Sequence, residues 1–412
     1  MEVKRTTHKL QGGSPMRDNR KLLEFLFSVS ELSPHAAEYS RRQVMRAAAR
    51  LGLGAGAAVA LNRMIGPRLA LAADAPALPE ITSIPEKLKG SGVVRVCSYG
   101  GAFQDAQRKA YFEPFEHLSG IKVVESQGPD IVKLKAMVDT NNIEYDVGEF
   151  DRAGVINLTK KGDYWEEIDY GLIDVNNIDK AFQFKYSLGM LPYAQTYAWR
   201  TDVFKDAKPA SWADFWDTKK FPGPRTMPAG SGGLTPFLEA AVLATGVPMD
   251  KVYPMDIDKA YESLAKIKPS VVKWWEAGAV PAQMLNDKEA VMAVAWNGRI
   301  AAIQANGAPV EVGWRQGALR TDDWAVPKGA ANAGNAMKFT AFITMAVPQA
   351  RLSMLIPYGF VNNAAAEHLS ADRLKTLPTA PDIKKEMFVY NSQWWSDNRD
   401  KVVEKWASWL LQ

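Results

Sequence analysis

Sequence patterns typical of strands and of helices alternate along residues 93–149, and this alternation limits the fold more than any other feature. A run of β-branched residues predicts a strand, whereas apolar residues three and four apart predict a helix. The predicted elements are a strand over 93–98, a helix over 102–118, a strand over 121–124, a helix over 131–138 and a strand over 145–149. This β-α-β-α-β order predicts parallel strands joined by crossover helices, and therefore an α/β fold.

A second region of the same kind follows residue 200. After the loop 228–233 we expect a helix with Thr235 as its N-cap and Pro236 as its first residue. The apolar residues 290–296 predict a buried strand, and the amphipathic pattern of 397–411 predicts a C-terminal helix. With 412 residues, the chain is long enough for two α/β regions rather than one.

Four short segments follow predicted strands and are candidates for a binding site. In open α/β sheets, ligands collect beyond the carboxyl ends of the strands, where helix N-termini and backbone N–H groups point. The segments are 99–101, 149–151, 231–233 and 296–299. Taken alone, each glycine-containing segment is equally compatible with a simple turn. Ser231 begins a Ser-Gly-Gly sequence that lacks the lysine of a phosphate-binding loop.

The first 72 residues account for the net positive charge of the chain. They hold twelve lysines and arginines against five acidic residues, so the formal net charge of +4 becomes about −3 for the rest of the chain. A basic surface attracts nucleic acids and anionic membranes. Because the basic residues gather at the front, we expect no nucleic-acid partner.

That front segment resembles a secretory signal. The pair Arg41-Arg42 precedes a short apolar run over 51–61, and small residues follow at 70–72 and at 73–75. This order predicts a twin-arginine signal peptide over 1–72, cleaved near residue 72 to 75, and hence a periplasmic protein. The alternatives are a start at Met16 and a basic tail before a buried Ala/Gly helix.

Cysteine and histidine are too scarce for a disulfide or a metal centre. Cys97 is the single cysteine, so no disulfide forms within the chain. Of four histidines, two precede the predicted cleavage site, and His117 and His368 lie far apart in sequence. We therefore expect no His/Cys metal site and no cofactor.

The order of several short motifs resembles a known family. These motifs are residues 111–116, 120–123, 199–204, 211–216, 295–298, 324–328 and 358–362. Their order over nearly all of 92–412 resembles the solute-binding proteins of ABC importers, in particular the polyamine (spermidine/putrescine) class. The resemblance implies that the protein is a monomer, that it binds a small molecule, and that its partners are the permease subunits of the importer in the inner membrane.

The resemblance also implies a two-lobed fold of the periplasmic-binding-protein type II, with mixed sheets flanked by helices. Lobe 1 would consist of 92–195 and 318–370, and lobe 2 of 196–317 and 371–412. The ligand would lie in a cleft between the lobes and would drive closure by contacting both of them at once.

Carrying the family's binding residues onto this sequence gives seven positions. An aromatic residue after the first strand, a carboxylate after the third strand, a tryptophan before Asn-Gly, a late carboxylate and a late tyrosine match the family. With the two positions at which the family pattern changes, the set is Tyr99, Gly100, Asp151, Trp296, Arg299, Asp322 and Tyr358. Ser231 joins it as a residue at a predicted strand exit.

Two departures from the family change the chemistry expected of the site. Gly100 and Gly101 stand where putrescine-binding members have serine and aspartate, and Arg299 stands where they have an aspartate for an ammonium group. An arginine repels an ammonium group and grips a carboxylate with two parallel hydrogen bonds. With Asp322 or Asp151 left to hold an amine, the sequence predicts either a polyamine or a zwitterionic ω-amino acid as ligand.

Each of these residues also has a structural interpretation. Arg299 could pair with a surface acid at the start of a helix over 300–305. Trp296 could be a core residue of its apolar strand, while Asp322 and Asp323 could be turn residues, as at least one of them is expected to be.

An enzyme is the alternative function. Thiaminase shares the two-lobed fold and uses a cysteine nucleophile, and Cys97 lies two residues before Tyr99. A reactive thiolate needs a base or a cation beside it, and the sequence places no histidine nearby. We therefore expect a binding protein rather than an enzyme.

Overall fold

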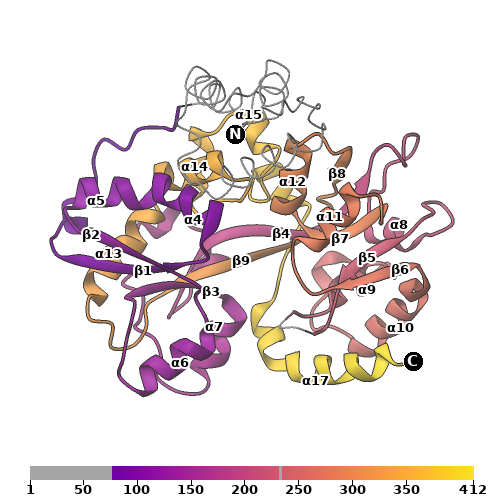
Figure 1. Ribbon diagram of the computed structural model, residues 1–412, viewed down its shortest axis with the longest axis horizontal. Coiled ribbons are helices and arrows are strands. Elements are labelled where there is room, and N and C mark those ends of the chain that lie inside the picture. The colour runs from indigo at the N-terminus through magenta and orange to yellow at the C-terminus, as the bar shows by residue number, and fades with distance from the viewer. Residues whose placement is uncertain (1–76, 232–233) are drawn as a thin grey trace, which may run out of the picture. The chain divides into compact units, whose positions relative to one another are not determined.

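The computed structural model describes residues 77–231 and 234–412, which form a mixed sheet of ten strands flanked by helices (Figure 1). The predicted signal peptide lies outside these residues. The strands are β1 Val93–Ser98, β2 Lys122–Gln127, β3 Val147–Asp151, β4 Leu188–Arg200, β5 Arg225–Pro228, β6 Val271–Trp275, β7 Met292–Trp296, β8 Val310–Val312, β9 Ala318–Ala325 and β10 Phe388–Val389.

Helices connect the strands and cover the sheet. The α-helices are α4 Gly101–Gln107, α5 Glu113–Ser119, α6 Ile131–Asp139, α7 Arg152–Thr159, α8 Trp212–Trp216, α9 Leu238–Leu243, α10 Ile257–Ile267, α11 Val280–Asn286, α12 Asn297–Ala305, α13 Ala333–Ile343, α14 Ala346–Leu355, α15 Ala371–Leu374, α16 Pro381–Lys385 and α17 Ser392–Leu410. A π-helical segment, Arg108–Phe112, joins α4 to α5. Short 3-10 helices are Glu86–Leu88, Val175–Asn177, Lys180–Phe182, Met249–Lys251, Lys268–Ser270 and Asn363–His368.

The strand order confirms the parallel arrangement that the sequence predicts. The order is β2-β1-β3-β9-β4-β7-β5-β6, with β10 beside β9 and β8 beside β4. Strand β1 pairs in parallel with β2 and β3, and β5 pairs in parallel with β6 and β7. Antiparallel pairing of β9 with β3 and β4 makes the sheet mixed.

Two strands link the halves of the sheet. Along β4, residues Leu188–Gln195 pair with β9 and residues Gln195–Trp199 pair with β7. Figure 1 shows β4 and β9 running between the half that contains β1 to β3 and the half that contains β5 to β7. Because these strands belong to both halves, the lobe boundaries expected at 195, 317 and 370 stay predictions.

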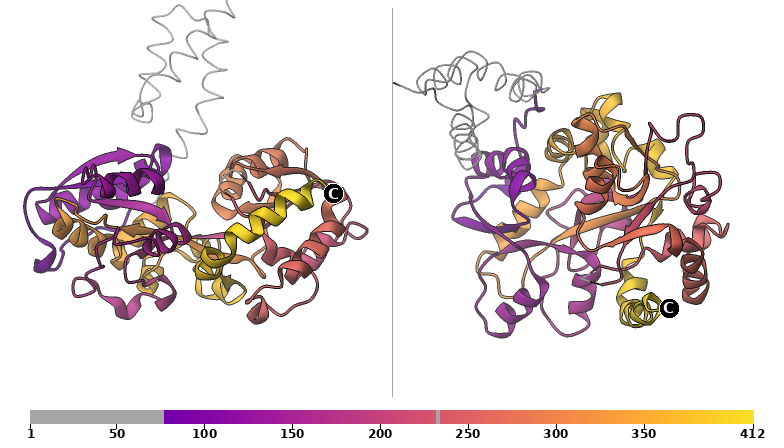
Figure 2. Two further views of the ribbon diagram at one scale, coloured as in Figure 1. Left: turned by 90° about the horizontal axis from the view of Figure 1, so that it is seen from below. Right: turned by 45° about the vertical axis from the view of Figure 1, so that its right-hand side comes forward.

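Each half of the sheet has its own hydrophobic core. Around β1 and α13, the rings of Phe115 and Phe342 lie 5.4 Å apart in a cluster of buried residues. Around β5 and β6, the amphipathic helix α17 buries Trp406 and Trp409 against Trp274, as its sequence pattern predicts. Figure 2 shows α17 lying along this second half. Burial of one such large side chain contributes about 1.5–3 kcal/mol.

The helix expected to begin at Pro236 begins later. Helix α9 starts at Leu238, its N-cap is Phe237, and no side chain caps it. The carbonyl of Pro236 accepts from the N–H of Leu238 at 2.9 Å, which forms a turn before the helix. Thr235, the expected cap, therefore lies three residues before the helix instead of at its N-cap position.

The two halves also meet where α7 and α17 lie side by side (Figure 1). Lys160 Nζ lies 2.5 Å from Asp397 Oδ1, and Ser396 Oγ donates to Asn157 Oδ1 at 2.6 Å. Helix α7 begins directly after the carboxyl end of β3, and the contact with α17 lies toward the other end of α7. Within the described residues, no helix combines the length and apolar character that crossing a membrane requires.

Candidate ligand-binding site

Tyr99 follows directly after β1 and begins a row of aromatic rings. Gly100, at a positive φ of 78°, turns the chain into α4. A Cβ atom at Gly100 would lie 2.8 Å from Gln127 Oε1, so a side chain would be strained there. Tyr99 remains 44% exposed, and its ring lies 6.2 Å from Phe103, which in turn lies 6.3 Å from Tyr358.

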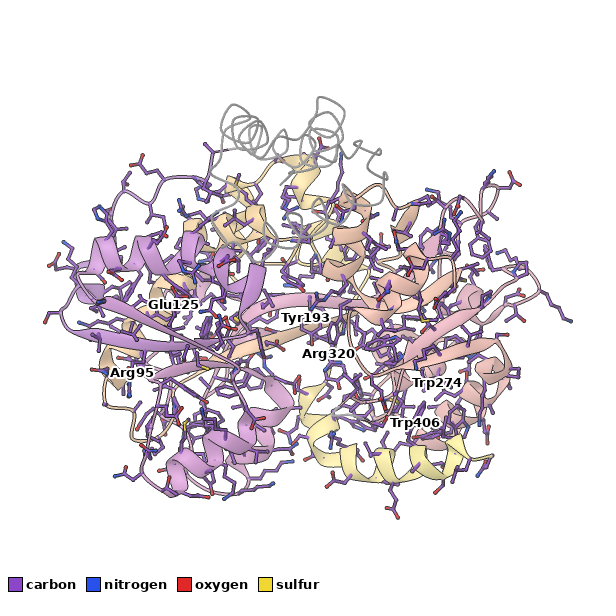
Figure 3. All side chains as sticks on the ribbon, viewed as in Figure 1. Arg95, Glu125, Tyr193, Trp274, Arg320 and Trp406 are labelled. Atoms are coloured by element: carbon purple, nitrogen blue, oxygen red, sulfur yellow. The ribbon has the colours of Figure 1, made fainter. Side chains whose placement is uncertain are left out.

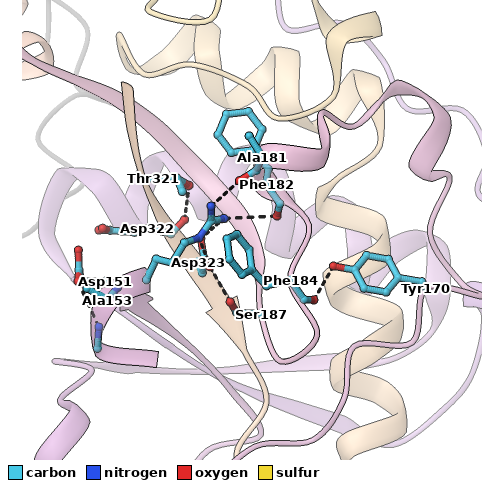
Figure 4. Close-up of polar contacts among 12 residues, drawn as sticks. Asp151, Ala153, Tyr170, Ala181, Phe182, Phe184, Ser187, Thr321, Asp322 and Asp323 are labelled. Carbon is cyan, nitrogen blue, oxygen red and sulfur yellow. Dashed lines mark hydrogen bonds and ion pairs between the residues drawn. The ribbon is translucent and has the colours of Figure 1, made fainter. Parts of the chain in front are cut away.

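Asp151 and Asp322 lie directly opposite each other on β3 and β9. Figure 4 shows both side chains at the same edge of the sheet. Asp151 caps α7 by accepting from the N–H of Ala153 at 3.0 Å. Burial and the neighbouring charge of Asp151 raise the pKa of Asp322 to about 7, although Tyr99 interacts with this carboxyl group and favours its ionised form. Two carboxylates on facing residues can bind an ammonium group between them.

Asp323 points away from this pair. Its carboxylate receives Arg152 Nε and Nη2, both at 2.8 Å, and Ser187 Oγ at 2.6 Å (Figure 4). The prediction that Asp322 or Asp323 is a turn residue is therefore wrong, because both belong to β9 and project from its opposite faces.

Arg320 is a second cation that sequence reasoning missed. Its Nη1 donates to Gln195 Oε1 at 2.6 Å, and its Nη2 lies 3.5 Å from Asp151 Oδ2. The guanidinium lies 4.0 Å from the ring centre of Tyr390, and its buried Nε has no partner among the described residues. Figure 3 shows Arg320 and Tyr193 at the junction of the two halves.

Trp296 ends β7 opposite Gln195 of β4. Its ring lies 6.0 Å from Tyr193 and 5.8 Å from Trp275, and its buried Nε1 has no partner among the described residues. Since Trp275 is a core residue and Tyr193 lies beside Arg320, Trp296 serves both as core packing and as a wall next to the charged residues.

Arg299 and Tyr358 are brought together at the start of α12. A Cβ atom at Gly298 would lie 2.6 Å from the Tyr358 ring, so only a glycine allows this approach. Burial and the charge of Asp322 raise the pKa of Tyr358, whereas the charge of Arg299 lowers it. Arg299 is exposed and forms no hydrogen bond or ion pair with another described residue. The surface acid expected as its alternative partner is thus absent from this part of the chain.

Ser231 lies apart from the acids. Its Oγ donates to Glu276 Oε1 at 2.5 Å, in the loop after β6. The same loop touches Trp296, because a Cβ atom at Gly278 would lie 2.0 Å from its ring. Ser231 is therefore connected to the site through this loop rather than by a contact with Asp151 or Asp322.

Cys97 is buried in a hydrophobic cluster with Leu134 and Phe150. Burial raises the pKa of its thiol, which disfavours the thiolate that a nucleophile requires. No group of three or more His, Cys, Asp or Glu residues in the described part of the chain has the arrangement of a metal site.

The candidate site thus combines acidic, basic and aromatic side chains. Asp151 and Asp322 are its acids, Arg299 offers a guanidinium without an ion-pair partner among the described residues, and Tyr99, Tyr358 and Trp296 are its aromatic side chains. Such an arrangement suits a small ligand that carries both charges on a short apolar chain. A surface hollow of about 620 Å³ beside β6 and α11 contains none of these residues.

Comparison with known proteins places this arrangement in a family. Residues 110–382 match the family model of the bacterial extracellular solute-binding proteins. The chain is 33% identical over 326 residues to a gamma-aminobutyric acid-binding protein of Pseudomonas aeruginosa, covering 77% of this chain and 90% of that one.

Two further relatives also match most of the chain. The solved structure of the Atu4243-GABA receptor is 36% identical, has a TM-score of 0.69 and covers 77% of this chain and 97% of its own. A spermidine/putrescine-binding periplasmic protein of Salmonella typhimurium is 25% identical over 302 residues, or 70% of this chain and 83% of that one. With its two-lobed α/β fold, the chain belongs to the bacterial extracellular solute-binding proteins and is the solute-binding component of an ABC transporter.

Proposed function

We propose that this protein captures a zwitterionic ω-amino acid, such as γ-aminobutyrate (GABA), for import. The observation that carries the proposal is the exposed guanidinium of Arg299, which follows the Gly298 that packs against Tyr358, together with the facing residues Asp151 and Asp322. The ammonium group binds Asp322 and Asp151, and the carboxylate binds Arg299. The methylenes lie against Tyr99 and Trp296, whose rings also attract the ammonium group.

The relatives support this ligand class over a diamine. The P. aeruginosa relative, at 33% identity, binds GABA, whereas the Salmonella relative that binds spermidine and putrescine is 25% identical. A second ammonium group about 4 Å from Arg299 would be repelled by roughly 4 kcal/mol at an intermediate dielectric. A polyamine, the other ligand expected from the sequence, is therefore the second candidate. The observation that favours it is the pair of facing acids, Asp151 and Asp322.

The cellular role follows from the family. Solute-binding proteins of ABC importers deliver a small molecule to permease subunits, and the Salmonella relative is periplasmic. We propose that this protein acts as a monomer in the periplasm after export by a twin-arginine signal.

Calorimetric titration with ligands of matched length tests the proposal. GABA and putrescine share one ammonium group and a similar chain, and differ in carrying a carboxylate or a second ammonium at the far end. We expect GABA or 5-aminopentanoate to bind much more tightly than the diamine. Tight putrescine binding with no response to either ω-amino acid would overturn the proposal.

The affinity for an ω-amino acid should depend on pH through Asp322. Its pKa is about 7 in the free protein, and a bound ammonium group would lower it by stabilising the ionised form. Binding below pH 7 must then release a proton, so affinity should fall up to about tenfold per pH unit as the pH decreases, and level off above pH 7. Titrations between pH 5 and pH 8 measure this slope.

The variant Asp322→Asn separates this effect from general acid sensitivity. It should bind weakly, and its affinity should be nearly constant over the same pH range. Asp105→Asn, which changes an aspartate on α4 that pairs with Arg108, is the matched control and should keep the wild-type slope. An affinity of the wild type that does not change between pH 5 and pH 7 would contradict the assignment of Asp322.

A further inference from the structure

Three buried polar side chains form a closed triangle beneath Tyr99. Glu149 of β3, Ser98 of β1 and Gln107 of α4 are all fully buried. Ser98 Oγ lies 2.5 Å from Gln107 Oε1 and 3.0 Å from Glu149 Oε2, and the Gln107 amide also bonds Glu149 Oε1. The N–H of Tyr99 donates to Glu149 Oε2 at 3.3 Å, which joins the triangle to the ligand-binding residue.

The triangle requires three protons, one for each of its contacts. The Ser98 hydroxyl supplies one. The Gln107 amide contacts Ser98 with one of its two polar groups, N–H₂ or C=O, and contacts Glu149 with the other. Whichever way the amide is turned, it supplies one proton to one of these two contacts. The third proton must come from the carboxyl group of Glu149. With an ionised Glu149, one contact would bring two oxygen atoms together without a hydrogen between them.

The surroundings of Glu149 also favour its neutral form. The titratable groups whose charges interact with it are Asp322 on β9, Tyr99 directly after β1 and Tyr111 on the π-helical segment, with Cys97 on β1 nearby. None of these four groups is a cation, and Asp322 carries a negative charge when it holds an ammonium group. Burial is the main cause that raises the pKa of Glu149 to about 8.

We propose that Glu149 is a positioning residue that stays protonated in the binding-competent protein, and that its proton closes the triangle that holds Tyr99 in place. This inference rests on the proposed function only for its effect on ligand binding. Tyr99 is attached to the triangle by its own N–H and by Ser98, the residue before it. Ionisation of Glu149 opens one side of the triangle and releases the turn that leads through Gly100 into α4.

The neutral variant Glu149→Gln tests the proton without removing the contacts. A glutamine amide supplies the third proton at every pH, and its carbonyl oxygen still accepts hydrogen bonds. Infrared spectra of the ligand-free wild type at neutral pH should contain a protonated-carboxyl band that is lost in the variant. A spectrum in which Glu149→Gln removes a carboxylate band instead would overturn the proposal.

Unfolding measurements give a second result that needs no ligand. The folded-state pKa of Glu149, about 8, exceeds the ordinary value of 4.5, so the stability that its proton confers is complete below pH 4.5. It is lost as the pH rises through 8. The variant should therefore gain stability relative to the wild type between pH 4.5 and pH 8. A difference that is constant over this range would contradict a protonated Glu149.

Ligand affinity reports on the positioning of Tyr99. Above pH 8, the wild type should lose up to about tenfold in ω-amino acid affinity per pH unit, whereas Glu149→Gln should keep its neutral-pH affinity to pH 9.5. Glu239→Gln, a matched change of a buried glutamate on α9 that accepts from Trp395 at 2.6 Å, should behave as the wild type. The ligand's own amine titrates higher, near pH 10.

The outcomes separate the two proposals. If no ω-amino acid binds, the proposed function fails, and the infrared and unfolding results still decide the protonation of Glu149. If an ω-amino acid binds and wild-type affinity stays constant or rises above pH 8, Glu149 does not position Tyr99. The same conclusion follows if the alkaline loss persists in Glu149→Gln.

Discussion

Replacing Arg299 by aspartate is expected to weaken GABA binding by at least about a hundredfold and to strengthen putrescine binding. Arg299 has no hydrogen bond or ion pair with another described residue, so the substitution breaks no contact within this part of the chain. It removes a charge-assisted pair with the ligand carboxylate and places a like charge there. Titration of the variant with both ligands measures the exchange.

The control for this exchange is another exposed arginine. Arg315 is exposed and lies in the turn before β9. Its charge lowers the pKa of Tyr197, a residue of the hydrophobic core around β5 and β6. Arg315→Asp should leave both affinities close to those of the wild type. Equal losses in Arg299→Asp and Arg315→Asp would show that net charge, rather than a carboxylate contact, governs binding.

Replacing Asp323 by alanine is expected to cost about 3–5 kcal/mol of unfolding free energy. The substitution leaves the guanidinium of Arg152 buried at 4% exposure without its carboxylate, and also removes the acceptor of Ser187. Denaturant unfolding at constant m-value measures the loss. Because Asp323 projects from the face of β9 opposite Asp322, ligand affinity of the folded variant should change much less than stability.

The same substitution at an exposed ion pair provides the comparison. Asp397 pairs with Lys160 at 2.5 Å, but their side chains are 50% and 43% exposed. Asp397→Ala should cost roughly 0–1 kcal/mol, as is usual for surface pairs. A similar cost at both positions would mean that burial does not determine the strength of the Arg152–Asp323 pair.

The alternation of strands and helices was enough to predict the parallel part of the sheet. The apolar runs at 93–98 and 290–296 lie in β1 and β7, and the amphipathic pattern at the end lies in α17. The start of α9 was predicted wrongly, because the chain forms a turn from Pro236 to Leu238 before the helix begins.

The acidic part of β9 was harder to read. Its residues Arg320, Asp322 and Asp323 resemble a polar turn, and only pairing with β3 and β4 makes them a strand. Once the strand is known, alternation places Arg320 and Asp322 on one face and Asp323 on the other. The arrangement of β9 between two partners is a tertiary property, so Arg320 could not be found from local sequence.

The order of the sequence motifs was enough to recognise the family. The ligand class was inferred from the residues at which this chain differs from the putrescine-binding members. The comparisons confirm a solute-binding component of an ABC transporter. Arg299 and Asp322 act on the pKa of Tyr358 in opposite directions, which agrees with the zwitterion inferred from the exchange of aspartate for arginine at 299.

A crystal structure of the protein with bound GABA would test the central claim most directly. The account predicts that the ligand carboxylate lies within hydrogen-bonding distance of the Arg299 guanidinium and that the ammonium nitrogen contacts Asp322, with Tyr99 and Trp296 against the methylenes. A carboxylate held by Arg320, a reversed ligand, or GABA bound away from Arg299 would contradict it.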